Sequence, residues 1–489
     1  MLKAQAKPME LQNAAFKKLQ KQLRGTETSK RSGLESAASL RDFLDQARAY
    51  KYDDIDDLVQ RQIRDIRSAA LFHDTFEFVG LSSGTTGRNS KNILFNKPMI
   101  RNFEKFQMAF GSVIEAHSNV RLLSDQRLTW GSSAQTGVTP SGVPCGYVSG
   151  FLSTRVPKVL AKKAFPRPET GMIEDMTAKL QQTANEVRHT DLRLLSGVPT
   201  YLINLLEFLK DVYQVENFSE IWPNLSTVVY SATSIEPYRD QLCKLIGRPL
   251  TFIGCYVSTE GPIGYEIPSI TPNGVYAFHL GDVVYSFRKT EGEDKRFLTL
   301  EDLNEGDEVE VFVSSPNGLL SYSMGDVIRI YAKKPVISFE IVGRVGQGLN
   351  VATEKATLAQ LQKAVLQVSR DIRHFFVYPA QSEAERPCYA WTFFVDDPAA
   401  WDTEQVREDI DKALMGQNWD YEEARLETLF LDSPQVDFVS SDLLRVYFKQ
   451  ESHRGQLKMK YAFDSQAKAD EFITRLLMGL EVNIPAAAA

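Results

Sequence analysis

The spacing of apolar side chains in the first 75 residues predicts helices. Apolar positions recur every three or four residues within 40–44 and again within 55–66, which is the period of an amphipathic helix. At 75–79 the period changes to two, which indicates a strand. This strand leads into the polar segment 80–91, GLSSGTTGRNSK, and an extended pattern resumes at 92–95.

Helices then alternate with short apolar strands as far as about residue 256. A long amphipathic helix is expected at about 101–117 and another at 202–209, whereas 226–230 and 250–256 are short apolar runs. Such strands, separated by helices, are typical of a sheet covered on both faces. Between 281 and 344 the pattern instead predicts consecutive strands joined by glycine-containing turns, which indicates an antiparallel β subdomain.

The pattern changes again after residue 343. A helix at 358–370 and strands at 375–379 and 389–395, followed by another helix and two more strands, indicate an α+β unit. We therefore expect an α/β protein of two domains. The large N-terminal domain, 1–343, has mixed sheets covered by helices plus the antiparallel β subdomain, and a small mobile α+β domain spans 344–489.

Composition excludes some classes of partner. The 489 residues are 43% hydrophobic with a formal net charge of −7, which favours a folded protein that binds neither nucleic acid nor an anionic membrane. The four cysteines have no metal-ligand spacing, and no apolar run is long enough to span a membrane. We therefore expect reduced thiols, no structural zinc and a cytoplasmic location.

The polar segment 80–91 has three possible interpretations. Its first five residues match the G-x-S-x-G nucleophile elbow of hydrolases, its glycines and hydroxyls suit phosphate, and its composition is that of a flexible linker. A linker is disfavoured because strands are predicted on both sides. The elbow is disfavoured because residues 85–90 form a poor helix start and because the late histidines, His374 and His453, lie in no hydrolase motif.

The phosphate interpretation gains from the order of several motifs. The segment 82–91 resembles the phosphate loop of the acyl-adenylate-forming superfamily, although it is not a Walker loop. Downstream, YVSTE at 256–260 resembles the Y-x-[ST]-[ST]-E motif of that superfamily, and YSMGD at 322–326 resembles its Y-x-x-G-D motif. The G-R pair at 343–344 and GQLK at 455–458 resemble its hinge and its mobile catalytic lysine. Five motifs in this order are more specific than any one of them.

Within the superfamily, the chain is most similar to the Gretchen Hagen family of acyl acid amido synthetases. The similarity rests on IWPNL at 221–225, GLLSY at 318–322, MGDVIR at 324–329, and the pair 354–355 followed by the helix at 358–365. The resemblance implies ATP-dependent adenylation of a small carboxylic acid, with release of pyrophosphate and with Mg²⁺. Transfer of the acyl group to an amine, which we expect to be an amino acid, would then form an amide. The alternatives are thioester formation, as in acyl-CoA ligases and acyl-protein synthetases, and a non-catalytic nucleotide-binding protein.

The resemblance also implies roles for individual residues. Glu260 is the Mg²⁺ ligand, Tyr256 stacks on adenine, Asp326 binds the ribose hydroxyls, and Lys458 is the mobile catalytic lysine. Lys355 joins Glu260 and Lys458 in the catalytic set. The expected ATP-binding residues are Ser82, Ser83, Gly84, Thr85, Thr86, Gly87, Lys91, Ala232, Thr233, Tyr256, Ser258, Thr259, Asp326 and Arg344. The segments 130–138 and 196–201 are candidates for the lining of the acid pocket, and the sequence does not identify the acid.

Overall fold

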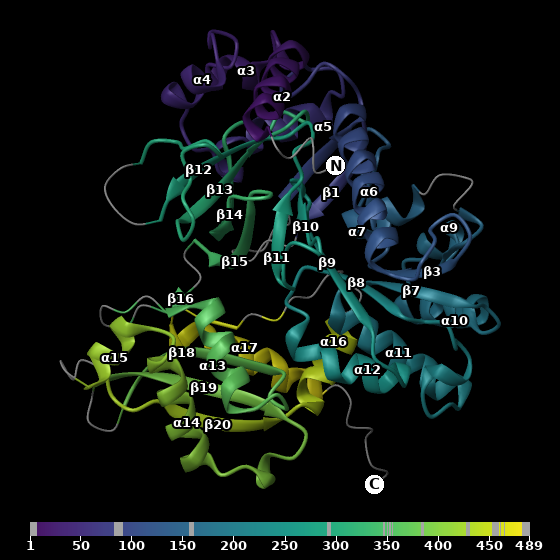
Figure 1. Cartoon of the computed structure of the whole chain (residues 1–489), viewed down its shortest axis with the longest axis vertical. Helices are drawn as coiled ribbons and strands as arrows, with labels where there is room; N and C mark the ends of the chain where they lie inside the picture. The colour runs from purple at the N-terminus through teal and green to yellow at the C-terminus, as the bar shows by residue number, and fades with distance from the viewer. Residues whose placement is uncertain are drawn as a thin grey trace. The chain divides into compact units, whose positions relative to one another are not determined.

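The computed structural model (Figure 1) divides the chain into two compact units, Met1–Ile341 and Val342–Ala489. The residues that it describes are 7–82, 91–155, 161–290, 295–345, 348–349, 351, 354, 356–382, 386–426, 431–451, 459, 461–463 and 465–481. No helix among these residues has the length and apolarity needed to cross a membrane.

Four helices come first among the described residues of the first unit, as the apolar spacing predicts. They are α2 (Pro8–Leu23), α3 (Glu27–Ser32), α4 (Leu40–Gln46) and α5 (Asp56–Arg64). Hydroxyl side chains start two of them, because Thr26 accepts the N–H of Ser29 and Ser39 accepts that of Asp42. Helix α2 packs on strand β12 (Val284–Lys289), where the buried Gln12 side chain bonds the strand backbone.

One mixed sheet of eleven strands forms the centre of the first unit (Figure 1). Its parallel part, in spatial order, is β9, β8, β7, β3 and β6, and its antiparallel part continues from β9 through β10, β11, β15, β14, β13 and β12. The expected antiparallel subdomain is therefore an extension of the central sheet. Its strands are β3 (Gln126–Trp130), β6 (Ala164–Phe165), β7 (Leu192–Gly197), β8 (Thr227–Ser231), β9 (Thr251–Ser258), β10 (Gly261–Tyr265), β11 (Val275–Phe278), β12, β13 (Glu308–Ser314), β14 (Tyr322–Ala332) and β15 (Ser338–Arg344).

Helices cover both faces of the parallel strands. Leu195 and Val228 pack on one face against α11 (Pro199–Tyr213), with α10 (Met176–Val187) and α12 (Arg239–Ile246) alongside. Leu194 and Val229 point to the other face and pack against α6 (Lys97–His117). Adjacent residues of a strand thus enter different cores, which explains the continuous apolar runs in the sequence.

A second, four-stranded sheet of the first unit carries the polar segment. Its order is β2, β1, β5, β4, with bounds Lys91–Asn96, Phe76–Ser82, Pro144–Gly146 and Gly137–Val138. Strand β1 pairs antiparallel with β2 and parallel with β5. Helix α7 (Val148–Thr154) follows β5, and the short helix α9 (Pro168–Gly171) follows β6.

The second unit is α+β. Its sheet has the order β18, β19, β20, with bounds His374–Gln381, Pro387–Val395 and Gln435–Ser440. Where two strands were expected after the second helix, the described residues form one, and Ala462 adds a single bridge to Val377. The remaining elements are β16 (Gly348–Leu349), β17 (Ala356–Thr357), α13 (Leu358–Val368), α14 (Thr403–Met415), α15 (Trp419–Leu426), α16 (Asp442–Glu451) and α17 (Gln466–Glu481).

Candidate active site

The polar segment begins and ends in a β-hairpin. Ser82, the last residue of β1, pairs with Lys91, the first residue of β2. A nucleophile elbow places its serine on the sharp turn that follows a strand, whereas Ser82 is still paired within β1, which argues against the hydrolase interpretation. Both ends are fixed in a sheet, which excludes a linker. The predicted phosphate-loop residues Ser83, Gly84, Thr85, Thr86 and Gly87 lie outside the described residues.

The start of this hairpin lies against the YVSTE segment. A Cβ atom at Gly80 would lie only 2.8 Å from Cγ2 of Thr259 and 2.7 Å from Cε2 of Phe95. Any side chain at this position would therefore push the two segments apart. The glycine that precedes the loop thus allows two of the five motifs to meet.

Thr259 and Glu260 form the turn between β9 and β10. Ser258 closes the turn, because its Oγ lies 3.2 Å from both the amide nitrogen and the carbonyl oxygen of Gly261. Glu260 is buried, with 8% of its surface exposed. It lies just after the carboxyl end of β9, which pairs parallel with β8, and this is where open α/β sheets bind ligands.

Tyr256 and Asp326 are brought together from strands that are distant in the sequence. The hydroxyl of Tyr256, in β9, donates a hydrogen bond to the carboxylate of Asp326, in β14. The Tyr256 ring packs against Tyr276 and Phe339, with ring centroids 6.2 and 6.1 Å away. The predicted adenine and ribose residues are therefore neighbours.

Ala232 and Thr233 follow β8, the parallel neighbour of β9. Ala232 has a φ of +70°, a left-handed conformation that is uncommon for a residue with a side chain and that clusters at functional sites. The sheet thus places the end of β8 beside the end of β9, which carries Tyr256 and Glu260.

The two segments expected to line the acid pocket are also adjacent. Trp130, at the end of β3, pairs with Gly197, at the end of β7, and a Cβ at Gly197 would lie 2.6 Å from the Trp130 carbonyl oxygen. A Cβ at Gly150 would lie 2.5 Å from the carbonyl oxygen of Ser132. The carboxyl ends of β3, β7, β8 and β9 therefore form one edge, and this edge carries most of the described candidates.

The remaining candidates belong to the second unit. Arg344 is the last residue of β15 and lies within that unit, Val342–Ala489. Lys355 and Lys458 lie outside the described residues. Their roles remain predictions. Among the described residues, no group of three or more His, Cys, Asp or Glu side chains could hold a metal ion by itself.

Glu266 is a buried residue that no sequence motif indicates, with 1% of its surface exposed. One of its carboxylate oxygens accepts the Tyr230 hydroxyl and the N–H of Gly274 at 2.6 Å. The other accepts the N–H of Gly254 at 2.6 Å and the Asn273 amide at 2.9 Å. Burial, together with the nearby carboxylate, raises the pKa of Tyr230. Since Tyr230 and Gly254 each lie two residues before a candidate site residue, Glu266 fixes the strands that carry the site.

A second set of residues without a sequence signal lies at 50–52. The Tyr52 hydroxyl accepts the N–H of Asn92 at 3.0 Å, one residue after Lys91. The backbone carbonyl of Tyr50 accepts the N–H of Ser323 at 2.8 Å, and the N–H of Tyr50 donates to the Ser321 carbonyl at 3.0 Å, at the start of the YSMGD motif. Residues 50–52 therefore connect the exit of the predicted phosphate loop to the strand that carries Asp326.

We expect Tyr52→Phe to weaken ATP binding several-fold. The variant keeps the ring but leaves the half-buried Asn92 N–H without its acceptor, and a lost hydrogen bond of this kind costs about 1 kcal/mol. The measurement is the Kd for ATP by calorimetry. Tyr50→Phe is the matched control, since its hydroxyl donates to the Arg31 carbonyl instead. Equal affinities in both variants would show that Tyr52 does not position the loop.

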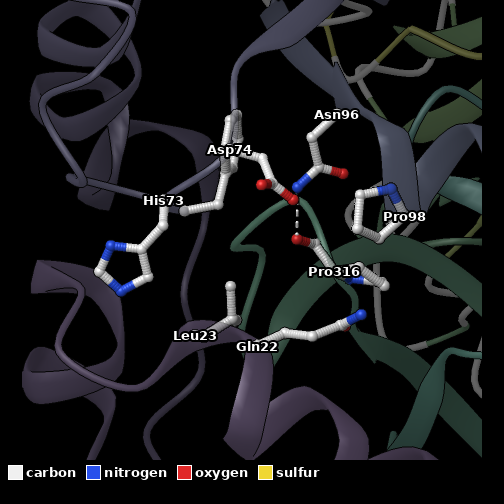
Figure 2. Close-up of a pocket in the computed structure, with 8 residues that line it drawn as sticks. Gln22, Leu23, His73, Asp74, Asn96, Pro98 and Pro316 are labelled. Carbon is white, nitrogen blue, oxygen red and sulfur yellow. Dashed lines mark hydrogen bonds between the residues drawn. The ribbon is translucent and has the colours of Figure 1, made fainter.

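A small polar pocket lies apart from these residues. Figure 2 shows the residues that line it. Asn96 donates to the Pro316 carbonyl at 2.8 Å and caps α6 by accepting the Met99 N–H, and His73 bonds the Arg24 carbonyl at 2.6 Å. These contacts join the end of β2 and the start of α6 to Pro316, and they join His73 to the end of α2, so we assign the pocket a structural role. Its lining residues are Gln22, Leu23, Phe72, His73, Asp74, Asn96, Pro98 and Pro316.

Comparisons with protein families give two matches. The model of the GH3 family N-terminal domain matches residues 1–211, and that of the GH3 family central domain matches residues 285–344. Together the two segments make up more than half of the chain. No curated protein sequence matches.

Solved structures share the fold. The AtGH3.15 acyl acid amido synthetase, in complex with 2,4-DB, superposes with a TM-score of 0.77 and 16% identity over 99% of this chain and 95% of that chain. A 2-hydroxyisobutyryl-CoA ligase in the postadenylation state superposes with a TM-score of 0.56 and 12% identity over 95% and 92%. These likenesses confirm the predicted α/β fold class.

Proposed function

Because this chain belongs to the GH3 family, the Gretchen Hagen family that its motifs resemble, we propose that it is an acyl acid amido synthetase. The observation that supports this most directly is the Tyr256–Asp326 hydrogen bond beside the buried Glu260. It joins residues from two of the family motifs at the edge of the sheet where the polar hairpin also begins.

The proposed reaction has two steps. In the first, a carboxylate oxygen of the acid attacks the α-phosphorus of ATP, an O–P bond forms and pyrophosphate leaves. In the second, the nitrogen of an amine attacks the acyl carbon, AMP leaves, and the amine loses a proton as the amide forms. We propose an amino acid as the amine. In both steps negative charge accumulates on the reacting groups or leaves with the departing group. Preorganised hydrogen-bond donors and cations therefore lower the activation barriers.

Glu260 fits a magnesium ligand. Mg²⁺ is commonly held through one or two carboxylates plus substrate phosphates, and a single buried carboxylate at the turn matches that pattern. The absence of a larger acidic cluster among the described residues also suits this mode of binding. When bound, the ion would neutralise charge on the phosphate oxygens.

The nucleotide would lie along the ends of β8 and β9. In our proposal Tyr256 contacts adenine, with Ala232 and Thr233 beside it, while Asp326 accepts hydrogen bonds from the ribose hydroxyls. The Tyr256 hydroxyl already bonds one side of that carboxylate and so fixes its orientation. The hydroxyl-rich hairpin from Ser82 to Lys91 would donate to the phosphates.

The second unit would complete the site. We propose that 344–489 act as a lid, that Lys458 reaches the α-phosphate and the acid carboxylate when the lid closes, and that Arg344 and Lys355 assist. Opening and closing of such a lid separates the two steps and can limit turnover. We further propose that the enzyme works in the cytoplasm.

The first experiment measures carboxylate-dependent exchange of labelled pyrophosphate into ATP across a panel of acids. We expect exchange with at least one acid, and an amide by mass spectrometry once amino acids are added. A thioester formed with CoA would instead favour the alternative reaction, which the fold shared with a CoA ligase keeps open. If no acid supports exchange and ATP does not bind, adenylation is refuted.

A further inference from the structure

Lys179 is a buried lysine that no motif uses. It lies on α10 with 2% of its surface exposed. Its ammonium donates to the carbonyl oxygen of Gly131 at 2.7 Å and lies 5.1 Å from the centroid of the Trp130 ring. These two residues end β3 and begin the segment expected to line the acid pocket. The buried ammonium therefore contacts the start of that segment from the interior of the protein.

The burial of this charge is costly to the fold. Lys179 forms no ion pair with any described residue. Glu186, on the same helix, accepts hydrogen bonds from Thr170 and Arg167, and Asp175, the residue before the helix, accepts one from Ala178. Burial alone lowers the pKa of Lys179 to about 8. An apolar residue of similar length would avoid this desolvation cost. The role of the ammonium should therefore lie in the groups that it contacts.

The segment after β3 is held at several points. The N–H of Ala134 donates to the carbonyl of Gly171, in α9, at 3.2 Å. The hydroxyl of Ser133 donates a hydrogen bond to the carbonyl oxygen of Gln135 at 3.0 Å. Gly150, in α7, lies so close that a Cβ there would be 2.6 Å from the amide nitrogen of Ala134. Lys179 fixes the beginning of this segment, since it bonds the first carbonyl after the strand.

We infer that Lys179 is a positioning residue for the acyl acid, because it holds the Gly131 carbonyl and thereby sets the wall of the acid pocket beside the nucleotide edge. This inference rests on the proposed function. Its ammonium is too buried to meet the acid directly, so its influence passes through the 131–134 segment. It should consequently affect acid binding and leave ATP binding unaffected.

The test is Lys179→Met, assayed by pyrophosphate exchange with the acid and ATP varied in turn. We expect the KM for the acid to rise about tenfold, which corresponds to about 1.4 kcal/mol, because a charge-assisted hydrogen bond to the segment is lost. The KM for ATP and kcat should stay within about twofold. Lys179→Gln keeps an N–H donor without the charge, so its KM for the acid should lie between those of the Met variant and the wild type.

Thr183→Val is the matched control. Thr183 lies one turn further along the same face of α10, is fully buried, and its hydroxyl has no hydrogen-bond partner among the described residues. Its loss should leave both KM values unchanged. Equal KM values for the acid in the wild type, Met and Gln enzymes would overturn the inference, as would a parallel change in both KM values and kcat. If the wild type supports no exchange, the proposed function fails instead.

Discussion

Glu260→Gln is expected to reduce acid-dependent pyrophosphate exchange by on the order of 10³. Glutamine is nearly isosteric, so the turn between β9 and β10 should keep its shape, but the neutral amide cannot balance a divalent cation. The loss of one preorganised electrostatic partner typically costs 10²–10³ in rate. We expect a loss at the upper end of this range because Glu260 is buried, and charges interact more strongly in the protein interior than in water.

The measurement is the exchange rate as a function of Mg²⁺ concentration at saturating ATP. The wild type should saturate with Mg²⁺, whereas the variant should stay slow at every concentration. Glu104→Gln provides the control, because Glu104 is an exposed carboxylate on α6. An exchange rate in the Glu260 variant within about threefold of the wild-type rate would show that Glu260 does not bind the metal.

The second large effect is on stability. Glu266→Leu should lower the free energy of unfolding of the first unit by about 3–5 kcal/mol, because the variant removes the acceptor of four donors, of which those of Tyr230 and Gly254 are buried. Together the four donors join β8, β9 and the turn at 273–274. The measurement is a urea titration followed by circular dichroism, read from the transition of this unit.

Tyr230→Phe is the graded control for this prediction. It removes one of the four donors and keeps the ring that packs in the core, so we expect a loss of about 1–2 kcal/mol. If Glu266→Leu costs no more than Tyr230→Phe, the carboxylate does not act as the common acceptor of this cluster. Leucine would then simply fill the space, as apolar replacements of buried charges sometimes do.

Much of the fold follows from local patterns. The N-terminal helices, the strands on both sides of the polar segment and the alternation of helix and strand up to β9 lie where the apolar spacing predicts them. These elements are specified by residues a few positions apart, which a single sequence displays. The pattern could not reveal that the antiparallel strands extend the central sheet, because strand pairing joins residues distant along the chain.

The candidate site likewise has features that local patterns predict and features that depend on contacts between distant segments. A reader of the sequence alone can find the motifs, their order and the family, since each motif is a short run with its own chemistry. The folded structure is needed to see that the polar segment closes a hairpin, that Tyr256 contacts Asp326, and that Glu266 and Lys179 are buried beside the site. The physical reason is that burial and hydrogen bonding between distant segments depend on how the sheet is assembled. Neither burial nor such hydrogen bonding produces a periodic pattern in the sequence.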